Sequence, residues 1–290
     1  MNRVKKGFFF YANPYRPRSV EVTRSLCAFF EARGEHIYTE SWLAEQGIGA
    51  CAELSEAAPD LRAVVAIGGD GTLLRIAPIA AKARLPLLGI HAGHVGFLMQ
   101  GDAGDPESVY TALTQSAYTL DAHRLLRVTA GERSFTVLND VTVTRGEHPG
   151  VIEVQAFADG EWLFTAHGDG AAVSTPLGAT AYALAAGGPI LRPDTPCVLV
   201  TPICARELLL RPVLLPRDTV VRLRVQGSPR RRLQLSLDGQ ALLPITTETE
   251  IRVSPAEEEA LFIQMGKLRF FDTLRKKQLL WNAPTENEQE

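Results

Sequence analysis

Cysteine is scarce in this chain of 290 residues, and the few cysteines that occur are scattered: Cys27, Cys51, Cys197 and Cys204. They form no Cys-x-x-Cys pair, which argues against a disulfide framework and against a zinc site, and favours reduced thiols in a reducing compartment. Long apolar runs are also missing, which excludes a membrane-spanning helix. The apolar run over residues 8–11 is too short for a signal peptide, so we expect a cytoplasmic protein.

An excess of charge of one sign is missing as well. The 30 lysines and arginines nearly balance 33 aspartates and glutamates, which leaves a net charge of -3 and a pI of about 6.1. This balance excludes the strongly basic surface that nucleic acids or anionic membranes attract. The chain does contain 46% hydrophobic and 22% charged residues, which is typical of a soluble globular protein, and its length favours two domains.

The first part of the chain alternates short apolar runs with helical patterns. Strands are predicted over residues 7–12, 36–39, 63–67 and 87–90, and helices over residues 19–33, 74–83 and 106–116. Strands that alternate with helices indicate a parallel sheet with crossover connections. We therefore expect an α/β domain over residues 1–117.

The pattern changes near Tyr118 to short strand-like runs separated by turn signals. They lie at residues 126–129, 134–138, 151–157, 161–165, 220–225 and 233–237. This spacing indicates an antiparallel β domain, which we place at residues 118–254, with one helix-like interruption over 179–186. A final segment, residues 255–290, contains a predicted helix over 270–281.

The most informative motif is Gly68-Gly69-Asp70-Gly71-Thr72, which follows an apolar strand and precedes a helix-like segment. Glycines without Cβ atoms let backbone N–H groups approach a ligand closely, and a helix N-terminus adds oriented donors. Such a turn suits phosphate. A carboxylate beside polyanions makes sense if Asp70 accepts a proton or orients a metal. A tight turn in which Asp70 only caps the next helix is the alternative.

A second motif runs from Gly168-Asp169-Gly170 to the segment Thr180-Ala181-Tyr182. Small residues and hydroxyls are concentrated in it, so backbone can approach a flat ligand closely, Thr180 can donate or accept a hydrogen bond, and Tyr182 can cover a ring. The alternative is a glycine-rich crossover between β layers with Tyr182 in the core. The motif alone leaves both interpretations open.

Three shorter motifs add polar groups. Asn139-Asp140 can bind a ribose diol or an adenine edge, or it forms an Asx turn. His91 and His94 lie in a glycine-rich loop, where no third metal ligand is evident, so we assign no metal site to protein side chains. Leu237-Asp238-Gly239-Gln240 is typical of a hairpin turn, and on its own it indicates nothing more.

Taken in order, these motifs resemble those of the NAD kinase family. The family carries a Gly-Gly-Asp-Gly-Thr loop, a Gly-x-(Asn/His)-x-Gly-x-x-Gly-Phe loop, an Asn-(Glu/Asp) pair, a Gly/Ser-Asp-Gly…Ser-Thr-Pro-x-Gly-x-Thr-Ala-Tyr block and a late Asp-Gly-Gln turn. The matching stretches here are residues 68–72, 89–97, 139–140, 168–188 and 238–240. The likeness extends from Ala63 to about Trp281. Each motif alone has little specificity, but five in this order are specific.

The resemblance implies a fold and an activity. The expected fold is an α/β N-terminal domain with a parallel Rossmann-like sheet, an all-β sandwich as C-terminal domain, and a helical tail that packs back on the first domain. The expected reaction transfers the terminal phosphoryl group of ATP to the 2′-hydroxyl of the adenosine ribose of NAD and gives NADP, with Asp70 as general base. Mg²⁺ or another divalent metal accompanies ATP, and polyphosphate is an alternative donor.

The resemblance also implies binding residues and partners. NAD or ATP is expected to contact Gly68, Gly69, Gly71, Thr72, Phe97, Asn139, Asp140, His167, Asp169, Thr180, Ala181, Tyr182, Ala185 and Gln240. Asp169 is expected to reach the site from a neighbouring subunit, because the family forms homodimers and homotetramers. No nucleic acid and no membrane is expected as a partner.

The chain departs from the family pattern at a few positions. Hydroxyl residues are usual where Leu177 and Ala179 stand, an arginine is frequent where His167 stands, and Ser or Asn where Ala185 stands. These departures put affinity and substrate preference in doubt and keep a catalytically silent NAD-binding homologue as an alternative. A lipid kinase of the diacylglycerol type shares the glycine loop, but gives the Thr180-Ala181-Tyr182 segment no role.

Overall fold

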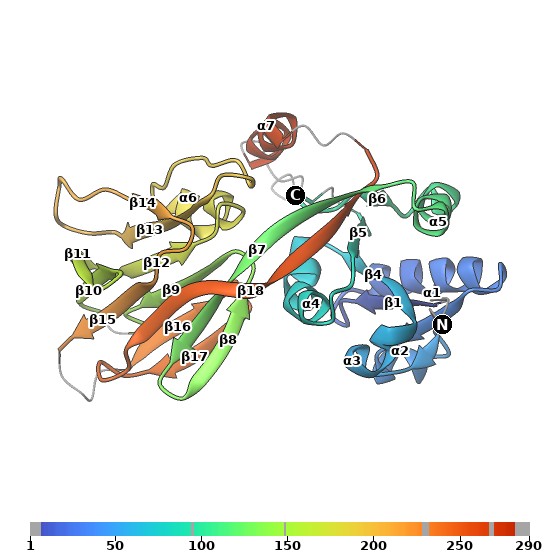
Figure 1. The fold of residues 1–290 in the computed structure, drawn as a ribbon, viewed down its shortest axis with the longest axis horizontal. Coiled ribbons are helices and arrows are strands. Elements are labelled where there is room, and N and C mark those ends of the chain that lie inside the picture. The colour runs from blue at the N-terminus through green and yellow to red at the C-terminus, as the bar shows by residue number, and fades with distance from the viewer. Residues whose placement is uncertain (1–6, 94–95, 148, 228–231, 267–269, 282–290) are drawn as a thin grey trace, which may run out of the picture. The chain divides into compact units, whose positions relative to one another are not determined.

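The computed structural model describes residues 7–93, 96–147, 149–227, 232–266 and 270–281. The chain divides into two compact units (Figure 1). The first unit holds the residues up to Asp121 and those from Leu261 onward, and the second holds Ala122–Ala260. Among the described residues, no helix is long and apolar enough to cross a bilayer.

The first unit is built on a parallel sheet. Its strands follow the order β3 (Ala50–Cys51), β2 (His36–Thr39), β1 (Gly7–Ala12), β4 (Leu61–Gly68) and β5 (Leu87–His91). The short strand β6 (Gly101–Asp102) and the end of β18 (Ile251–Gln264) also run parallel to β5. The predicted parallel α/β sheet is therefore confirmed, and the bounds of β1 and β2 agree with the sequence pattern.

Helices cover both faces of this sheet. The longer ones are α1 (Pro17–Glu31), α4 (Asp70–Lys82) and α5 (Pro106–Gln115), and the short ones are α2 (Ser41–Ala44), α3 (Leu54–Ala57) and the 3-10 turn η1 (Ala58–Asp60). One face packs its even-numbered β1 side chains against α1 and α5, with Phe8 and Phe10 each 5.4 Å edge-on from Phe30. Helix α4 lies on the other face, where Gly89 of β5 makes room for Leu73.

The C-terminal helix α7 (Phe270–Trp281) belongs to the first unit. Its Phe270 ring packs edge-on against Phe97, with 5.4 Å between ring centroids, and Leu274 is buried. The resemblance-based expectation that the tail returns to the first domain is confirmed.

The second unit is a β-sandwich. One sheet has the order β11 (Glu161–Gly168), β10 (Ile152–Ala158), β15 (Val221–Gln226), β18, β7 (Thr119–Ala130) and β8 (Arg133–Val137). The other has the order β14 (Val213–Pro216), β13 (Cys197–Ile203), β12 (Gly170–Ser174), β9 (Asp140–Thr144), β16 (Leu233–Leu237) and β17 (Ala241–Ile245). Valine, leucine and isoleucine side chains of both sheets form one buried core, so the predicted all-β sandwich is confirmed.

Candidate functional site

The glycine motif of the first unit joins a strand to a helix, as the sequence predicts. Strand β4 ends at Gly68, Gly69 is the N-cap of α4, and Asp70 is the first helical residue. A Cβ atom at Gly68 would overlap the Thr72 hydroxyl, so glycine lets the buried Thr72 fold back under the loop. The α4 N-terminus thus lies at the carboxyl end of β4, where ligands of open α/β sheets bind and where its N–H groups favour anions.

The Asp70 side chain connects this turn to a second glycine-rich loop of the first unit, the loop that contains Gly96 and Phe97. Its carboxylate accepts hydrogen bonds from the backbone N–H groups of Phe97 at 2.9 Å and Leu98 at 3.0 Å. A Cβ at Gly96 would overlap the Asp70 carboxylate, so glycine permits this approach. Since Gly69 occupies the N-cap position, the role of Asp70 differs from that of a simple cap. These two backbone donors belong to one loop, so they orient the Asp70 carboxylate.

A cavity of about 380 Å³ adjoins the second glycine loop in the first unit. Phe97 and Thr273 lie on its wall, together with the carboxylate-bearing Asp102 and Asp105. His91 Nε2 lies 3.8 Å from Asp102 Oδ1. The other histidine of this loop, His94, lies outside the described residues. In the described part of the chain, no three histidine, cysteine or acidic side chains gather as metal ligands.

The Asn139-Asp140 pair of the second unit lies at the start of β9 and is held from three sides. Thr175 donates its N–H to the Asn139 carbonyl at 2.8 Å, and the Tyr182 N–H hydrogen-bonds the Asp140 carboxylate. Asp238 accepts the N–H groups of both residues of the pair. Burial, and secondarily the charge of Asp238, raises the pKa of Asp140 to about 7. The pair is therefore held in place by the fold, with Asp140 buried and Asn139 half-buried.

The Gly168-Asp169-Gly170 motif connects β11 to β12. A Cβ at Gly168 would press on the Ile203 and Cys204 backbone, and one at Gly170 would overlap the Val143 carbonyl. The Asp169 carboxylate accepts a hydrogen bond from Arg145 Nε at 2.7 Å, and both side chains are partly exposed. The close approach of neighbouring backbone therefore explains why residues 168 and 170 are glycines. The Asp169 carboxylate is oriented by Arg145.

The following block folds over the outer face of β12. Thr175 ties it down, since its hydroxyl donates to the Leu138 carbonyl at 2.7 Å and accepts the Gly178 N–H at 3.0 Å. The 3-10 turn η2 (Gly178–Thr180) and the short helix α6 (Tyr182–Ala185) follow. Tyr182 is 47% exposed, so the interpretation that places it in the core is wrong.

The unusual residues of this block fall into two environments. Leu177 and Ala179 are buried, so their apolar side chains fill interior space. The family pattern described above has hydroxyl residues at these two positions. Ala185, in contrast, is exposed. Thr180 is partly buried and donates its hydroxyl to the Leu177 carbonyl at 3.2 Å, and Ala181 is partly buried beside it.

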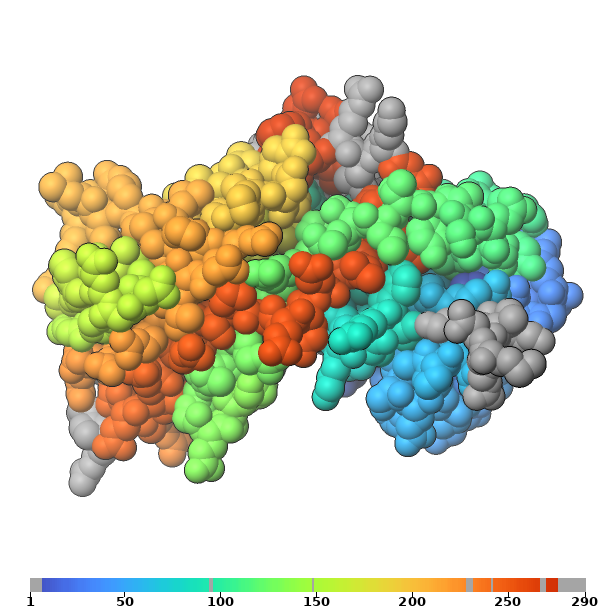
Figure 2. Space-filling model, viewed as in Figure 1, coloured from blue at the N-terminus to red at the C-terminus, as the bar shows by residue number. Residues whose placement is uncertain are grey.

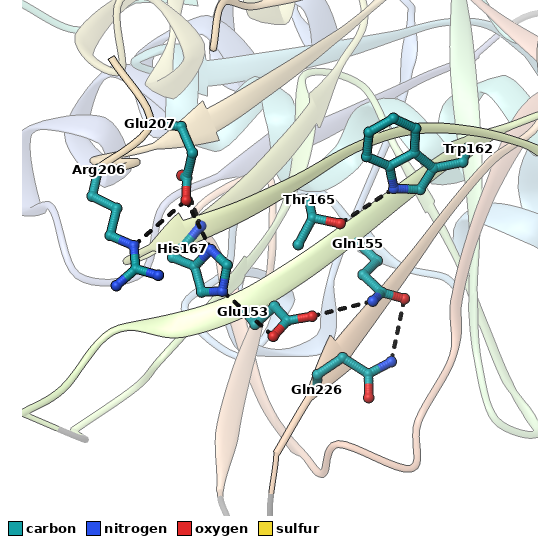
Figure 3. Close-up of polar contacts among 8 residues, drawn as sticks. All are labelled: Glu153, Gln155, Trp162, Thr165, His167, Arg206, Glu207 and Gln226. Carbon is teal, nitrogen blue, oxygen red and sulfur yellow. Dashed lines mark hydrogen bonds and ion pairs between the residues drawn. The ribbon is translucent and has the colours of Figure 1, made fainter. Parts of the chain in front are cut away.

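His167 lies in a polar network on β11 (Figure 3). Its Nδ1 lies 2.8 Å from Glu207 Oε1 and its Nε2 3.5 Å from Glu153 Oε2. The backbone N–H of His167 also donates to Glu207 Oε2 at 3.0 Å, and this hydrogen bond lowers the pKa of Glu207 to about 2. The β10–β11 hairpin that carries this network lies at the surface of the second unit, in yellow-green in Figure 2. Because carboxylates flank the His167 ring on both sides, the surroundings of this ring carry negative charge.

The structure thus gathers the expected residues into a group in each unit. The first unit brings the Gly68–Thr72 loop to Phe97, and the second brings Asn139 and Asp140 to Tyr182. Gln240 is exposed at the end of the β16–β17 hairpin. Sequence reasoning missed Asp238, which it left as a turn residue, although a carboxylate before a turn glycine was the available signal.

Comparisons with known proteins agree with this arrangement. Residues 8–118 match a family model described as the ATP-NAD kinase N-terminal domain, and residues 138–265 match the ATP-NAD kinase C-terminal domain. An NAD kinase of Heliobacterium modesticaldum is 34% identical over 271 residues, which are 91% of this chain and 95% of the relative. One of Moorella thermoacetica is 33% identical over 273 residues, with 92% and 87% covered.

Solved structures share the fold. A yeast NADH kinase complexed with NADH superposes with a TM-score of 0.83 at 22% identity, and 98% of this chain and 90% of that chain are covered. An NAD kinase of Archaeoglobus fulgidus in complex with ATP gives a TM-score of 0.68 at 21% identity, with 93% and 97% covered. By its two family models and its curated relatives, the chain belongs to the NAD kinase family.

Proposed function

We propose that this chain transfers the terminal phosphoryl group of ATP to the 2′-hydroxyl of the adenosine ribose of NAD, which gives NADP. The observation that carries the proposal is the placement of Asp70 at the N-terminus of α4, with its carboxylate fixed by two backbone N–H groups. The membership of the chain in the NAD kinase family, through both of its domains, supports the same reaction.

Asp70 acts as general base. An aspartate carboxylate is too weak a base to remove a proton from a sugar hydroxyl beforehand, so Asp70 orients the hydroxyl and takes its proton late. This suits phosphoryl transfer, whose transition state is loose and depends mostly on positioning and charge neutralisation. The N–H groups of Phe97 and Leu98 hold the acid in one orientation for that task.

The donor phosphates bind at the glycine loop. Gly68, Gly69 and Gly71 with the N-terminus of α4 supply N–H donors for the triphosphate, and Thr72 shapes the loop from beneath. Backbone N–H groups cannot ligate a cation, so Mg²⁺ would be held mainly by the substrate phosphates themselves. When bound with ATP, the metal neutralises charge on the triphosphate. Polyphosphate is a second donor to test.

The acceptor dinucleotide binds through the second unit. Asn139 and Asp140 bind the adenosine moiety, and Thr180, Ala181 and the exposed ring of Tyr182 contact the remainder. Phe97 is a further candidate contact to the substrates. In this proposal the domain of residues 1–117 holds the donor and the catalytic loop, and that of residues 118–254 holds the dinucleotide.

The proposal includes a homodimer or homotetramer in the cytoplasm, in which Asp169 of a neighbouring subunit reaches the dinucleotide. Its placement at the β11–β12 connection, partly exposed, supports this role. His167, Ala185 and Gln240 are the remaining candidate contacts. Of these, His167 is the least suited to a phosphate, because two glutamates flank its ring.

The test is a coupled assay of NADP formation with purified protein, in which NAD or NADH is combined with ATP or polyphosphate. NADP formation that depends on donor, acceptor and Mg²⁺ is the expected result. Tight NAD binding without ATP consumption would instead identify a silent binder, and phosphorylation of diacylglycerol a lipid kinase. Gel filtration with light scattering measures the oligomeric state in the same preparation.

A further inference from the structure

The turn between β16 and β17 carries an acid whose role the reaction above leaves unassigned. Asp238 and Gly239 both have positive φ, 51° and 62°, as the central residues of a tight hairpin turn do. The Asp238 carboxylate points back across the sheet rather than into solvent. It accepts the N–H groups of Leu138 at 2.8 Å, Asn139 at 2.7 Å and Asp140 at 3.0 Å.

These bonds fix the backbone that carries the adenosine-binding pair. The Asp238 N–H in turn donates to the Asp140 carbonyl at 2.9 Å, so the turn and the start of β9 hold each other through four hydrogen bonds. On the far side, the Tyr182 N–H hydrogen-bonds the Asp140 carboxylate. A continuous chain of contacts therefore runs from the hairpin turn, through Asp140, to α6.

Two carboxylates share this small buried region. Asp140 is only 4% exposed, and burial also raises the pKa of Asp238. The groups that face Asp140 are Asp238 from the hairpin turn, the Tyr182 N–H from α6 and the neutral Ser174, its partner on β12. Because like charges in a buried site disfavour each other, the ionisation of one acid depends on the other.

We propose that Asp238 is a positioning residue of the dinucleotide site, which holds Asn139 and Asp140 in their binding geometry and couples its own charge to the ionisation of Asp140. This inference rests on the proposed function only in naming NAD as the ligand. Asp238 itself touches the backbone of the binding pair, so it acts through that pair and not on the reacting atoms.

The chain offers a matched control in a second Asp-Gly turn. Asp159 and Gly160, between β10 and β11, also have positive φ, 49° and 92°. The Asp159 carboxylate likewise accepts a backbone N–H across the sheet, from Val220 at 2.8 Å. Asp159 thus reproduces the turn and the hydrogen-bonding type without contact to the adenosine-binding pair.

The first test compares Asp238→Asn with Asp159→Asn by calorimetry with NAD and by steady-state kinetics. Asparagine keeps one acceptor oxygen but turns an NH₂ group toward the Leu138 N–H, so Asp238→Asn should raise the Kd and KM for NAD about tenfold. We expect kcat to change less than threefold and Asp159→Asn to match the wild type. Equal NAD affinity in the two variants would overturn the positioning role.

The second test measures the coupling in the wild-type protein, so it holds even where Asp238→Asn fails to fold. Carboxyl ¹³C NMR titration should place the midpoint of Asp140 near pH 7, with an inflection of the Asp238 signal at the same pH. In Asp238→Asn the Asp140 midpoint should move to lower pH, because a neighbouring charge is lost. Independent titration of the two wild-type signals would contradict the coupling.

Failure of this inference is distinguishable from failure of the proposed function. If NADP forms but Asp238→Asn behaves like Asp159→Asn, only the positioning role fails. If no NADP forms while the two carboxyl signals remain coupled and NAD affinity falls in Asp238→Asn, only the kinase reaction fails.

Discussion

The same three residues, Gly-Asp-Gly, occur in both units and are used in different ways. In the first unit, Gly69-Asp70-Gly71 begins a helix, and its acid accepts two backbone N–H groups from a separate loop. In the second, Gly168-Asp169-Gly170 joins two strands, and its acid pairs with the side chain of Arg145. The glycines of the two motifs also differ. An added Cβ would meet neighbouring backbone at both Gly168 and Gly170, whereas at Gly69 it would meet nothing within 4 Å.

This difference shows that the partners of a carboxylate, more than its local sequence, decide what it is suited for. Backbone N–H groups are fixed by the fold, so they hold Asp70 in one orientation, which its proposed role as general base requires. The Arg145 side chain lies on a partly exposed surface and can change rotamer, so it holds Asp169 less firmly than backbone groups would.

Replacement of the two acids should separate their roles most strongly. Asp70→Asn keeps the shape of the side chain but removes the base, so NADP formation should fall about 10³-fold while the Kd for NAD changes less than fivefold. Stopped assays of NADP with calorimetry of NAD binding measure both. Asp169→Asn is the matched control and should lower kcat less than tenfold. Turnover near the wild-type value in Asp70→Asn would remove Asp70 as the base.

Gly170→Ala should have the next largest effect, on stability. The new Cβ overlaps the Val143 carbonyl, and backbone in the centre of a sheet cannot move aside, so we expect the free energy of unfolding to fall by at least about 3 kcal/mol. Urea unfolding measures this loss. Gly131→Ala is the control, because Gly131 has positive φ and no atom within 4 Å of its Cβ, and should cost about 1 kcal/mol. Equal losses would mean that conformational strain alone explains Gly170.

Periodicity predicted the elements whose apolar patterns are local. Strands β1 and β2 have the expected bounds, and α1 begins only two residues before the expected start, because Pro17 suits the first turn of a helix. Strand β12 was missed, since its small residues are typical of a loop, yet they let it lie buried in the middle of a sheet. Strand β18 was missed because three consecutive glutamates interrupt its alternation.

The candidate site was predictable in its residue types and not in its internal contacts. The turn at Asp238 was expected from Asp-Gly, but its three N–H partners lie 98 to 100 positions earlier in the chain. The approach of Asp70 to Phe97 likewise joins residues 27 positions apart. Local sequence carries no signal for such pairings, because tertiary packing decides them.

Gly96→Ala tests whether the orientation of Asp70, and not only its presence, matters. The added Cβ overlaps the Asp70 carboxylate, so the acid must rotate away from the Phe97 and Leu98 N–H groups. We expect kcat to fall ten- to a hundredfold with little change in melting temperature. Gly93→Ala in the same loop is the control, since nothing lies within 4 Å of its Cβ. If both variants keep full activity, the fixed orientation of Asp70 is unimportant.

Arg145→Ala should have the smallest effect and complete the contrast between the two acids. The Arg145–Asp169 pair has good geometry at 2.7 Å, but its side chains are 32% and 40% exposed, so solvent and salt screen it. We expect less than about 1 kcal/mol of lost stability, smaller still at 1 M salt. Urea unfolding at low and high salt checks this. A loss of several kcal/mol, unchanged by salt, would mean that Asp169 is held as firmly as Asp70, and that its release toward a second subunit is excluded.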